Sequence, residues 1–215
     1  SYPSGTYTLT CPEGLNVYPV DNAATFAAAA SNEKLDVINL EGKVTSVGVG
    51  FEVNHDVVLN LNGYEINAGS TATSMDYALE IYGDYRVEIN GAYLTRAGIA
   101  VEDGADVVFN SGEINHKPER TSRYIFTAHN GSTLTINDGT FKNDRAKNSF
   151  FWADGAVIYV EGGNFGGVAS NKKIVTTNGG QVIIKGGTFN FDPTAWLAEG
   201  YKATKSGSTW TVSKE

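Results

Sequence analysis

The sequence predicts an all-β protein, a right-handed, single-stranded parallel β-helix of about seven coils. Three observations predict this fold class. A short unit of alternating apolar residues recurs seven times along the chain. Glycine supplies 25 of the 215 residues, against roughly 15 at the average usage of about 7%, and its tolerance of positive φ allows frequent turns. Good helix-forming segments are scarce outside one patch near the N-terminus.

Each unit consists of two alternating apolar residues, a short polar step with Gly, and a closing apolar residue. The units are residues 37–44, 59–66, 87–94, 107–114, 134–141, 158–165 and 182–189. Their closing residues lie 20 to 28 positions apart and are Val44, Ile66, Leu94, Ile114, Phe141, Phe165 and Phe189. We expect these side chains to stack in an inner ladder, because neighbouring strands of a sheet lie about 4.8 Å apart.

A second short strand is expected after each of the first six units. These strands are residues 51–53, 79–81, 99–101, 125–127, 151–153 and 175–177. A turn, in most cases Asp or Asn with Gly, separates each strand from the next unit, and these residues tolerate left-handed backbone. A β-sandwich or barrel also has many short strands, but hairpins would not require the same unit seven times. Leucine-rich and propeller repeat signatures are absent from the sequence.

Caps are expected at both ends of the coil stack, because an open solenoid end exposes unpaired strand edges. Residues 21–30 predict an amphipathic helix with Asp21 or Asn22 as N-cap. Residues 192–200 predict a short helix with Asp192 as N-cap and Pro193 in its first turn.

A C-terminal hairpin is expected over residues 201–212, with its turn at Ser206 and Gly207. Trp196 and Trp210 are interpreted as plugs over the last coil. The expected organisation is therefore a connector or attachment strand over residues 1–20, a capped solenoid over 21–212, and a tail over 213–215.

Composition excludes several functional classes. The net charge of -8 argues against a general nucleic-acid partner. The apolar runs fall short of the roughly 20 residues that cross a bilayer, so we expect no membrane insertion. The single cysteine, Cys11, excludes an intrachain disulfide and a cysteine-based zinc site.

A basic and aromatic stripe of loops is the most informative functional feature of the sequence. Three segments leave equivalent points of successive units, and each carries a net charge of +2 although the whole chain carries -8. Segregated positive charge on an acidic body is typical of a contact surface, and aromatic residues with arginine are typical of interface cores. The candidate binding or subunit-contact residues are Lys117, Arg120, Arg123, Tyr124, Lys142, Arg145, Lys147, Phe150, Trp152, Lys172 and Lys173. At least one aromatic residue of the run 150–152 should face outward, because side chains alternate along a strand.

The sequence offers no catalytic set. His55, His116 and His129 lie in different coils without a metal-ligand spacing, and neither a Gly-x-Ser-x-Gly elbow nor a phosphate loop is present. We therefore predict no catalytic residues, no metal ligands and no cofactor. The acidic residues are interpreted as turn formers or as the solvated outer face of strands: Glu102, Asp103 and Asp106 at one turn, and Glu88, Asp138 and Glu161 at comparable places in their units.

Residues 21–212 resemble right-handed parallel β-helix proteins of the pectate-lyase-like kind. The resemblance is carried by residues 186–189, Asp192 with Pro193, residues 197–201 and residues 210–212, which look like the terminal coil and cap of such proteins. It implies a protein of gut bacterial surfaces or of bacteriophage fibres and appendages, located on a virion or cell surface.

Three functions are compatible with these expectations. The first is a non-enzymatic structural or adhesive module that self-associates, with a trimer favoured by analogy, and contacts virion or cell-surface proteins. The second is a polysaccharide-active lyase or hydrolase, whose stripe residues Arg120, Arg123, Arg145 and Lys147 would grip uronate carboxylates. The third is a glycan-binding surface protein without turnover. The short loops favour the first, because large β-helix enzymes build their clefts from long insertions.

Overall fold

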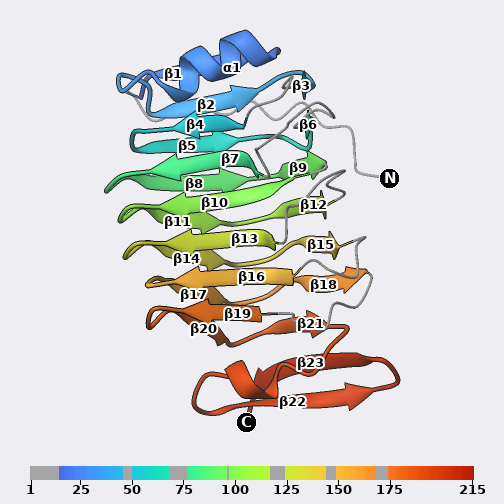
Figure 1. Cartoon of the computed structure of the whole chain (residues 1–215). Helices are drawn as coiled ribbons and strands as arrows, with labels where there is room; N and C mark the ends of the chain where they lie inside the picture. The colour runs from blue at the N-terminus through green and yellow to red at the C-terminus, as the bar shows by residue number, and fades with distance from the viewer. Residues whose placement is uncertain are drawn as a thin grey trace.

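The chain forms a parallel β-solenoid of about six turns, seen in the computed structural model of Figure 1. The structure describes residues 15–45, 50–67, 77–95, 97–116, 124–143, 149–167 and 174–215. Three sheets extend along the solenoid, and all their strand pairs are parallel except those of the C-terminal hairpin. The predicted all-β, parallel β-helix fold is confirmed.

The eight-stranded sheet contains, in spatial order, β1 (Val17–Val20), β2 (Val37–Leu40), β5 (Val57–Asn60), β8 (Arg86–Asn90), β11 (Asp106–Phe109), β14 (Thr133–Ile136), β17 (Val157–Val160) and β20 (Gln181–Ile184). The six-stranded sheet contains β4 (Phe51–Val53), β7 (Tyr77–Tyr82), β10 (Gly98–Glu102), β13 (Tyr124–His129), β16 (Ser149–Asp154) and β19 (Ile174–Thr177). The nine-stranded sheet contains β3 (Val44–Thr45), β6 (Glu65–Asn67), β9 (Ala92–Thr95), β12 (Gly112–His116), β15 (Thr140–Asn143), β18 (Asn164–Gly167), β21 (Gly187–Phe189), β23 (Thr209–Lys214) and β22 (Tyr201–Ser206).

Each complete turn takes one strand from each sheet, as in β11, β12 and β13. Every one of the seven predicted units forms a strand of the eight-stranded sheet followed by a strand of the nine-stranded sheet. The six predicted second strands form the six-stranded sheet. The last unit, β20 and β21, has no third strand, so the solenoid has about six full turns where seven coils were expected.

The predicted inner ladder forms the centre of the core. Its seven side chains face one another in register and are at most 1% exposed: Val44, Ile66, Leu94, Ile114, Phe141, Phe165 and Phe189. The period-two pattern of each unit explains this placement, because every second side chain of a strand points into the solenoid.

The N-terminal cap is helix α1 (Ala23–Ala30), which lies across the first turn (Figure 1). Asn22 is its N-cap, and the Asn22 side chain accepts hydrogen bonds from the backbone N–H groups of Ala24 and Thr25. Phe26 is fully buried, and its ring meets that of Phe51 edge-on with 4.8 Å between centroids. The expected cap over the first coil is confirmed.

The C-terminal cap differs from the expected helix. Only a 3-10 turn, η1 (Thr194–Trp196), forms, and Pro193 stands at its N-cap position. Asp192 instead accepts the Thr194 N–H in the preceding turn, at 3.0 Å. The Trp196 ring packs edge-on against Phe191, and Trp196 and Trp210 are both partly buried against the core. The hairpin of β22 and β23 follows as predicted.

The solenoid extends beyond the expected boundaries at both ends. Strand β1 pairs in parallel with β2 and buries Val20, so residues 17–20 belong to the first sheet. Strand β23 continues to Lys214. Within the described residues, neither helix has the length and apolar character that spanning a bilayer requires.

Candidate functional site

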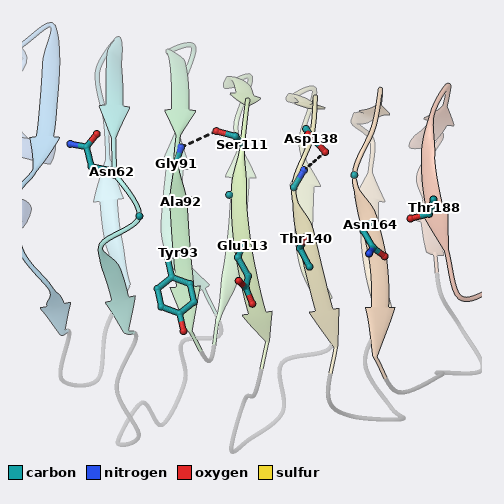
Figure 2. Close-up of a pocket in the computed structure, with 14 residues that line it drawn as sticks. Asn62, Gly91, Ala92, Tyr93, Ser111, Glu113, Asp138, Thr140, Asn164 and Thr188 are labelled. Carbon is teal, nitrogen blue, oxygen red and sulfur yellow. Dashed lines mark hydrogen bonds between the residues drawn. The ribbon is translucent and has the colours of Figure 1, made fainter. Parts of the chain in front are cut away.

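A shallow groove of about 1190 Å³ follows the corner between the eight-stranded and nine-stranded sheets. Its lining comes from six successive units, from Asn62 at one end to Thr188 at the other. Five coil spacings of about 4.8 Å give it a length of about 24 Å along the solenoid axis. Figure 2 shows the lining residues carried by consecutive strands, so the groove crosses the strands and can hold an extended ligand.

Corner glycines line the floor of the groove and let successive turns approach closely. Gly139 has φ +146, and a Cβ there would lie 2.8 Å from the carbonyl oxygen of Gly112 in the preceding turn. Gly163 has φ +107, and its Cβ would lie 3.2 Å from the carbonyl oxygen of Gly139. Both the backbone conformation and the close approach of successive turns require glycine. A Cβ at either position would also lie within 3 Å of the buried ring of Phe141, so glycine here lets successive turns and the inner ladder pack closely.

Outward-facing side chains of the nine-stranded sheet form one wall of the groove. Tyr93, Glu113, Thr140, Asn164 and Thr188 occupy equivalent positions on neighbouring strands and are in register. Tyr93 is half-buried, and its ring lies along its strand beside Glu113 (Figure 2). The wall therefore offers one aromatic ring, one carboxylate and three uncharged hydrogen-bonding groups.

Glu113 is held as a carboxylate. Lys142 Nζ lies 3.0 Å from Glu113 Oε1, and Asn115 donates an amide hydrogen to the same oxygen at 2.8 Å. The hydrogen bond from Lys142, together with that from Asn115, lowers the pKa of Glu113 below its ordinary value. Because a general acid must be protonated near the working pH, Glu113 is suited to accept hydrogen bonds and unsuited to donate a proton.

Asp138 supplies the second carboxylate of the groove. It is exposed, and its Oδ1 accepts the N–H of Gly139 at 2.7 Å, which orients the carboxylate at the corner (Figure 2). The sequence interpretation grouped Asp138 with Glu88 and Glu161. Glu88 lies away from this corner, whereas Glu161 is in the next turn, directly before Gly162, whose Cβ position is 4.0 Å from the Cα of Asp138. Glu88 lies on the outer face of β8 beside Arg86, and Glu161 is paired with Lys185 Nζ at 2.7 Å.

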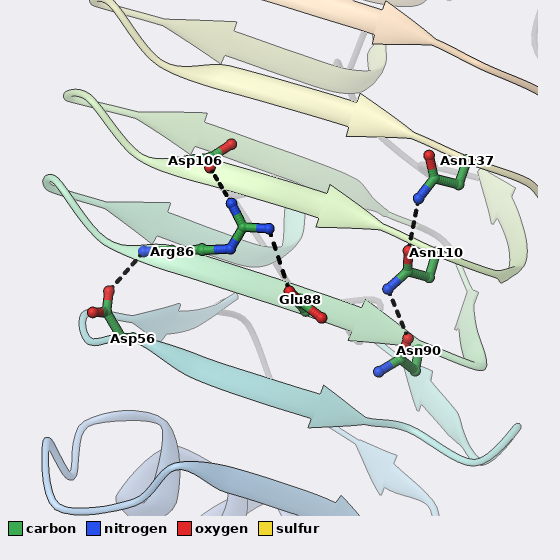
Figure 3. Close-up of polar contacts among 7 residues, drawn as sticks. All are labelled: Asp56, Arg86, Glu88, Asn90, Asp106, Asn110 and Asn137. Atoms are coloured by element: carbon green, nitrogen blue, oxygen red, sulfur yellow. Dashed lines mark hydrogen bonds and ion pairs between the residues drawn. The ribbon is translucent and has the colours of Figure 1, made fainter.

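An asparagine ladder borders the groove on the side of the eight-stranded sheet. Each side-chain amide donates to the side-chain oxygen of the asparagine in the preceding turn, at 2.7 to 3.0 Å, through Asn39, Asn60, Asn90, Asn110 and Asn137. Figure 3 shows the last three members. In the next two turns the same place is taken by the Glu161–Lys185 ion pair. Sequence reasoning placed these asparagines within the repeating units and gave them no role; their recurrence at one position of the unit was the signal for the ladder.

The outer face of the eight-stranded sheet carries an ion cluster around Arg86 (Figure 3). Arg86 pairs with Asp106 at 2.8 Å and with Glu88 at 3.4 Å, and its backbone N–H donates to Asp56. These exposed contacts pair charges on the sheet surface and give Asp106 a structural role. Asp103 also has a structural role, because it occupies a left-handed turn position and accepts a hydrogen bond from Asn130.

The predicted basic and aromatic stripe is only partly within the described residues. Seven of its members lie outside them: Lys117, Arg120, Arg123, Arg145, Lys147, Lys172 and Lys173. The strands that precede those segments, β12, β15 and β18, are adjacent and in register. The three segments therefore follow neighbouring strands, and the contact surface stays a prediction.

The four described members do not form one surface. Lys142 is on the nine-stranded sheet, bound to Glu113. Phe150 is 1% exposed and stacks on Phe191 in the core, which excludes a direct contact with a partner. Tyr124 and Trp152 lie on neighbouring strands of the six-stranded sheet, 5.1 Å apart between ring centroids. The expected outward aromatic residue of the run is Trp152, which is half-buried.

Trp152 belongs to a packed cluster. Its ring meets His129 edge-on at 4.4 Å, and its Nε1 donates to the Thr177 hydroxyl at 2.9 Å. Thr177 in turn donates to Asp154, and this bond, with that from Asn178, lowers the pKa of Asp154. The cluster orders the outer face of the six-stranded sheet.

The histidines occupy three separate environments. His55 and His116 are 3% and 0% exposed, and His129 packs against Trp152. Among the residues that the structure describes, no group of three or more His, Cys, Asp or Glu side chains is arranged to hold a metal ion.

Fold and groove together define a parallel β-solenoid protein with an axial polar groove. Comparison with protein-family models, with curated proteins and with solved structures gives no match to the chain.

Proposed function

We propose that the chain is a non-enzymatic structural and adhesive module, which holds an extended glycan in its axial groove at a virion or cell surface. The observation that carries this proposal is the continuity of the groove over six units in register. A ligand site of this shape suits a polymer better than a compact molecule, because its polar groups recur along the axis with the period of the coils.

The solenoid supplies a rigid support for such a site. Its lining residues are fixed by strand register and by glycine corners, so the groove needs no rearrangement on binding. Preformed sites lose less entropy when the ligand is ordered. A rigid rod with a binding face along its length is also the geometry that an adhesive module requires.

Binding without turnover agrees with the state of Glu113. Lys142 and Asn115 keep this carboxylate ionised, whereas retaining and inverting glycosidases need one protonated carboxyl group beside the bond that they cleave. A polysaccharide-active enzyme is the second candidate, because Glu113 and Asp138 line the groove from adjacent turns.

Incubation with soluble polysaccharides separates the two candidates. Affinity electrophoresis measures binding, while assays for reducing ends and unsaturated products measure cleavage. Retention without new chain ends supports the adhesive module, and accumulation of chain ends in proportion to protein concentration contradicts it. Tyr93→Ala tests whether retention uses the groove, and Tyr159→Ala, on the outer face of the eight-stranded sheet, is its matched control.

Self-association belongs to the same proposal and is tested separately. Light scattering on the purified chain measures whether the mass is 22.9 kDa or a multiple of it. A stable trimer supports the virion-fibre form of the module. A monomer at all concentrations contradicts self-association and leaves the groove as the functional feature.

A further inference from the structure

The groove carries negative charge and no positive charge on its described lining residues. Glu113 and Asp138 are its carboxylates, and neither Lys nor Arg is among the residues that line it. Lys142 lies beside the groove, but its ammonium group is bound to Glu113 at 3.0 Å. A polyuronate would place a row of carboxylates along this wall, and opposed like charges disfavour a complex.

The backbone at the floor of the groove is already hydrogen-bonded. Gly139 accepts the N–H of Asn164 at 2.7 Å, and Gly163 accepts the N–H of Thr188 at 2.8 Å. An extended peptide that binds by strand addition needs unpaired main-chain groups, and these floor carbonyls are engaged. Recognition therefore depends on the side chains of the wall, whose hydroxyl, amide and carboxylate groups match the hydroxyl groups of a sugar.

Tyr93 provides the apolar part of the site. In the register of the sheet it stands between Glu65 and Glu113, so one aromatic ring is flanked by two carboxylates. An uncharged pyranose can place its C–H face on such a ring and direct its hydroxyl groups to the neighbouring oxygens. Aromatic side chains combine large apolar contact area with defined geometry, which makes Tyr93 the expected anchor.

We propose that the groove selects an uncharged polysaccharide, with Tyr93 as its stacking platform, and that Glu113 and Asp138 exclude polyuronates. This inference rests on the proposed glycan-binding function and names the chemical class of the ligand. It concerns a different site from the predicted basic stripe, whose expected uronate-gripping residues lie outside the described residues.

Two probes test the selection directly: hydroxyethylcellulose, a neutral glucan, and polygalacturonate. In affinity electrophoresis the full chain should be retarded by the neutral probe and not by the acidic one. Tyr93→Ala should weaken retardation by roughly tenfold in apparent affinity, the usual effect of truncating an aromatic anchor. Tyr159→Ala should leave it unchanged.

Charge removal provides a second readout. The double variant Glu113→Gln, Asp138→Asn should gain retardation on polygalacturonate by about tenfold at low salt and lose the gain at high salt, because exposed charges are screened. Glu33→Gln with Glu199→Gln is the control, since it removes two exposed carboxylates outside the groove and changes net charge equally. Far-UV circular dichroism checks that both variants are folded.

The outcomes separate the specificity from the function. Tyr93-dependent retention of polygalacturonate by the unmodified chain overturns the selection and leaves glycan binding intact. An equal gain in the control variant also overturns it, because net charge would then explain the effect. Retention that is insensitive to Tyr93→Ala, or absent from both probes, overturns the proposed function itself.

Discussion

The N-terminal and C-terminal halves of the solenoid solve the same packing problem with different side chains. The inner ladder is aliphatic through Ile114 and aromatic from Phe141 onward. The rings of Phe165 and its neighbours Phe141 and Phe189 are stacked, with centroids 4.7 and 4.8 Å apart. These distances equal the spacing of strands in a sheet, so register alone places the rings at stacking distance.

The outer border of the groove changes along the same axis. The asparagine ladder runs through the N-terminal turns up to Asn137, and the Glu161–Lys185 ion pair takes its place in the last turns. Uncharged amides can continue indefinitely, since each both donates and accepts, whereas an ion pair ends after two residues. The two halves differ in side chains but share one strand register. Strand register therefore specifies the fold, while the residue type at each position adjusts local stability.

The largest expected effect comes from truncating a side chain in the aromatic half of the core. Phe165 contacts the rings of Phe141, Phe150, Phe151 and Phe189, so Phe165→Ala should lower the free energy of unfolding by about 4 kcal/mol. Leu94→Ala, at the same ladder position in the aliphatic half, should lower it by about 3 kcal/mol. Urea denaturation followed by circular dichroism measures both. A loss in Phe165→Ala no larger than that in Leu94→Ala would contradict a stabilising contribution from ring stacking, because phenylalanine also buries the larger area.

Amide hydrogen exchange compares the two halves of the solenoid strand by strand. Solenoids have mainly nearest-neighbour contacts, so Phe165→Ala should speed exchange in the C-terminal strands and leave the N-terminal ones protected. Uniform acceleration along the chain would contradict this.

Corner glycines occur in both halves, and their substitution should lower the free energy of unfolding by similar amounts in each. A Cβ on Gly112, where φ is +145, would lie 2.3 Å from the carbonyl oxygen of Ala92. Gly112→Ala should therefore lower the free energy of unfolding by about 3 kcal/mol. Gly131→Ala is the control, because Gly131 also has positive φ, at +79, but no atom lies within 4 Å of its Cβ position. The free energy of unfolding of the control should fall by about 1 kcal/mol. A similar loss in both variants would mean that the close approach of Gly112 to Ala92 does not limit the residue at this corner.

The asparagine ladder should contribute more than the ion pair that replaces it. Asn110→Ala removes one donated and one accepted hydrogen bond, so it should lower the free energy of unfolding by about 1.5 kcal/mol. Glu161→Gln removes a partly exposed ion pair and should cost about 0.5 kcal/mol or less. Urea midpoints measured at low and high salt distinguish them, since only the ion pair should depend on salt.

The sequence predicted the fold because the solenoid repeats one pattern. Alternating apolar residues and a closing apolar residue were enough to place the inner ladder, and glycine with Asp or Asn placed the corners. The groove was not predicted, because its wall residues differ from turn to turn and only register brings Tyr93, Glu113 and Asn164 into line.

Individual contact residues were harder to predict than elements. Phe150 and Phe151 are consecutive and both buried, which the alternation rule does not allow for. Phe150 is accommodated by stacking on Phe191, a residue distant in sequence. The asparagine that recurs at one position of the unit was given no role, because a ladder becomes visible only when successive turns are aligned.

The smallest expected effect concerns the ion pair beside the groove. The folded-state pKa of Glu113 is lowered by the hydrogen bond from Lys142, so the pair stabilises the fold fully above the ordinary glutamate value of 4.5. That contribution is lost as pH falls through the lowered pKa. Because both side chains are substantially exposed, Lys142→Met should lower the free energy of unfolding at neutral pH by about 0.5 kcal/mol or less.

Titration of the Glu113 carboxyl by NMR gives a direct measurement. In Lys142→Met the pKa of Glu113 should rise to or above its ordinary value, because burial, which raises it, then outweighs the remaining hydrogen bond from Asn115, which lowers it. The difference in stability between the two proteins should close as the solution is made more acidic. A Glu113 pKa unaffected by the substitution would mean that Lys142 does not hold the carboxylate in its ionised form.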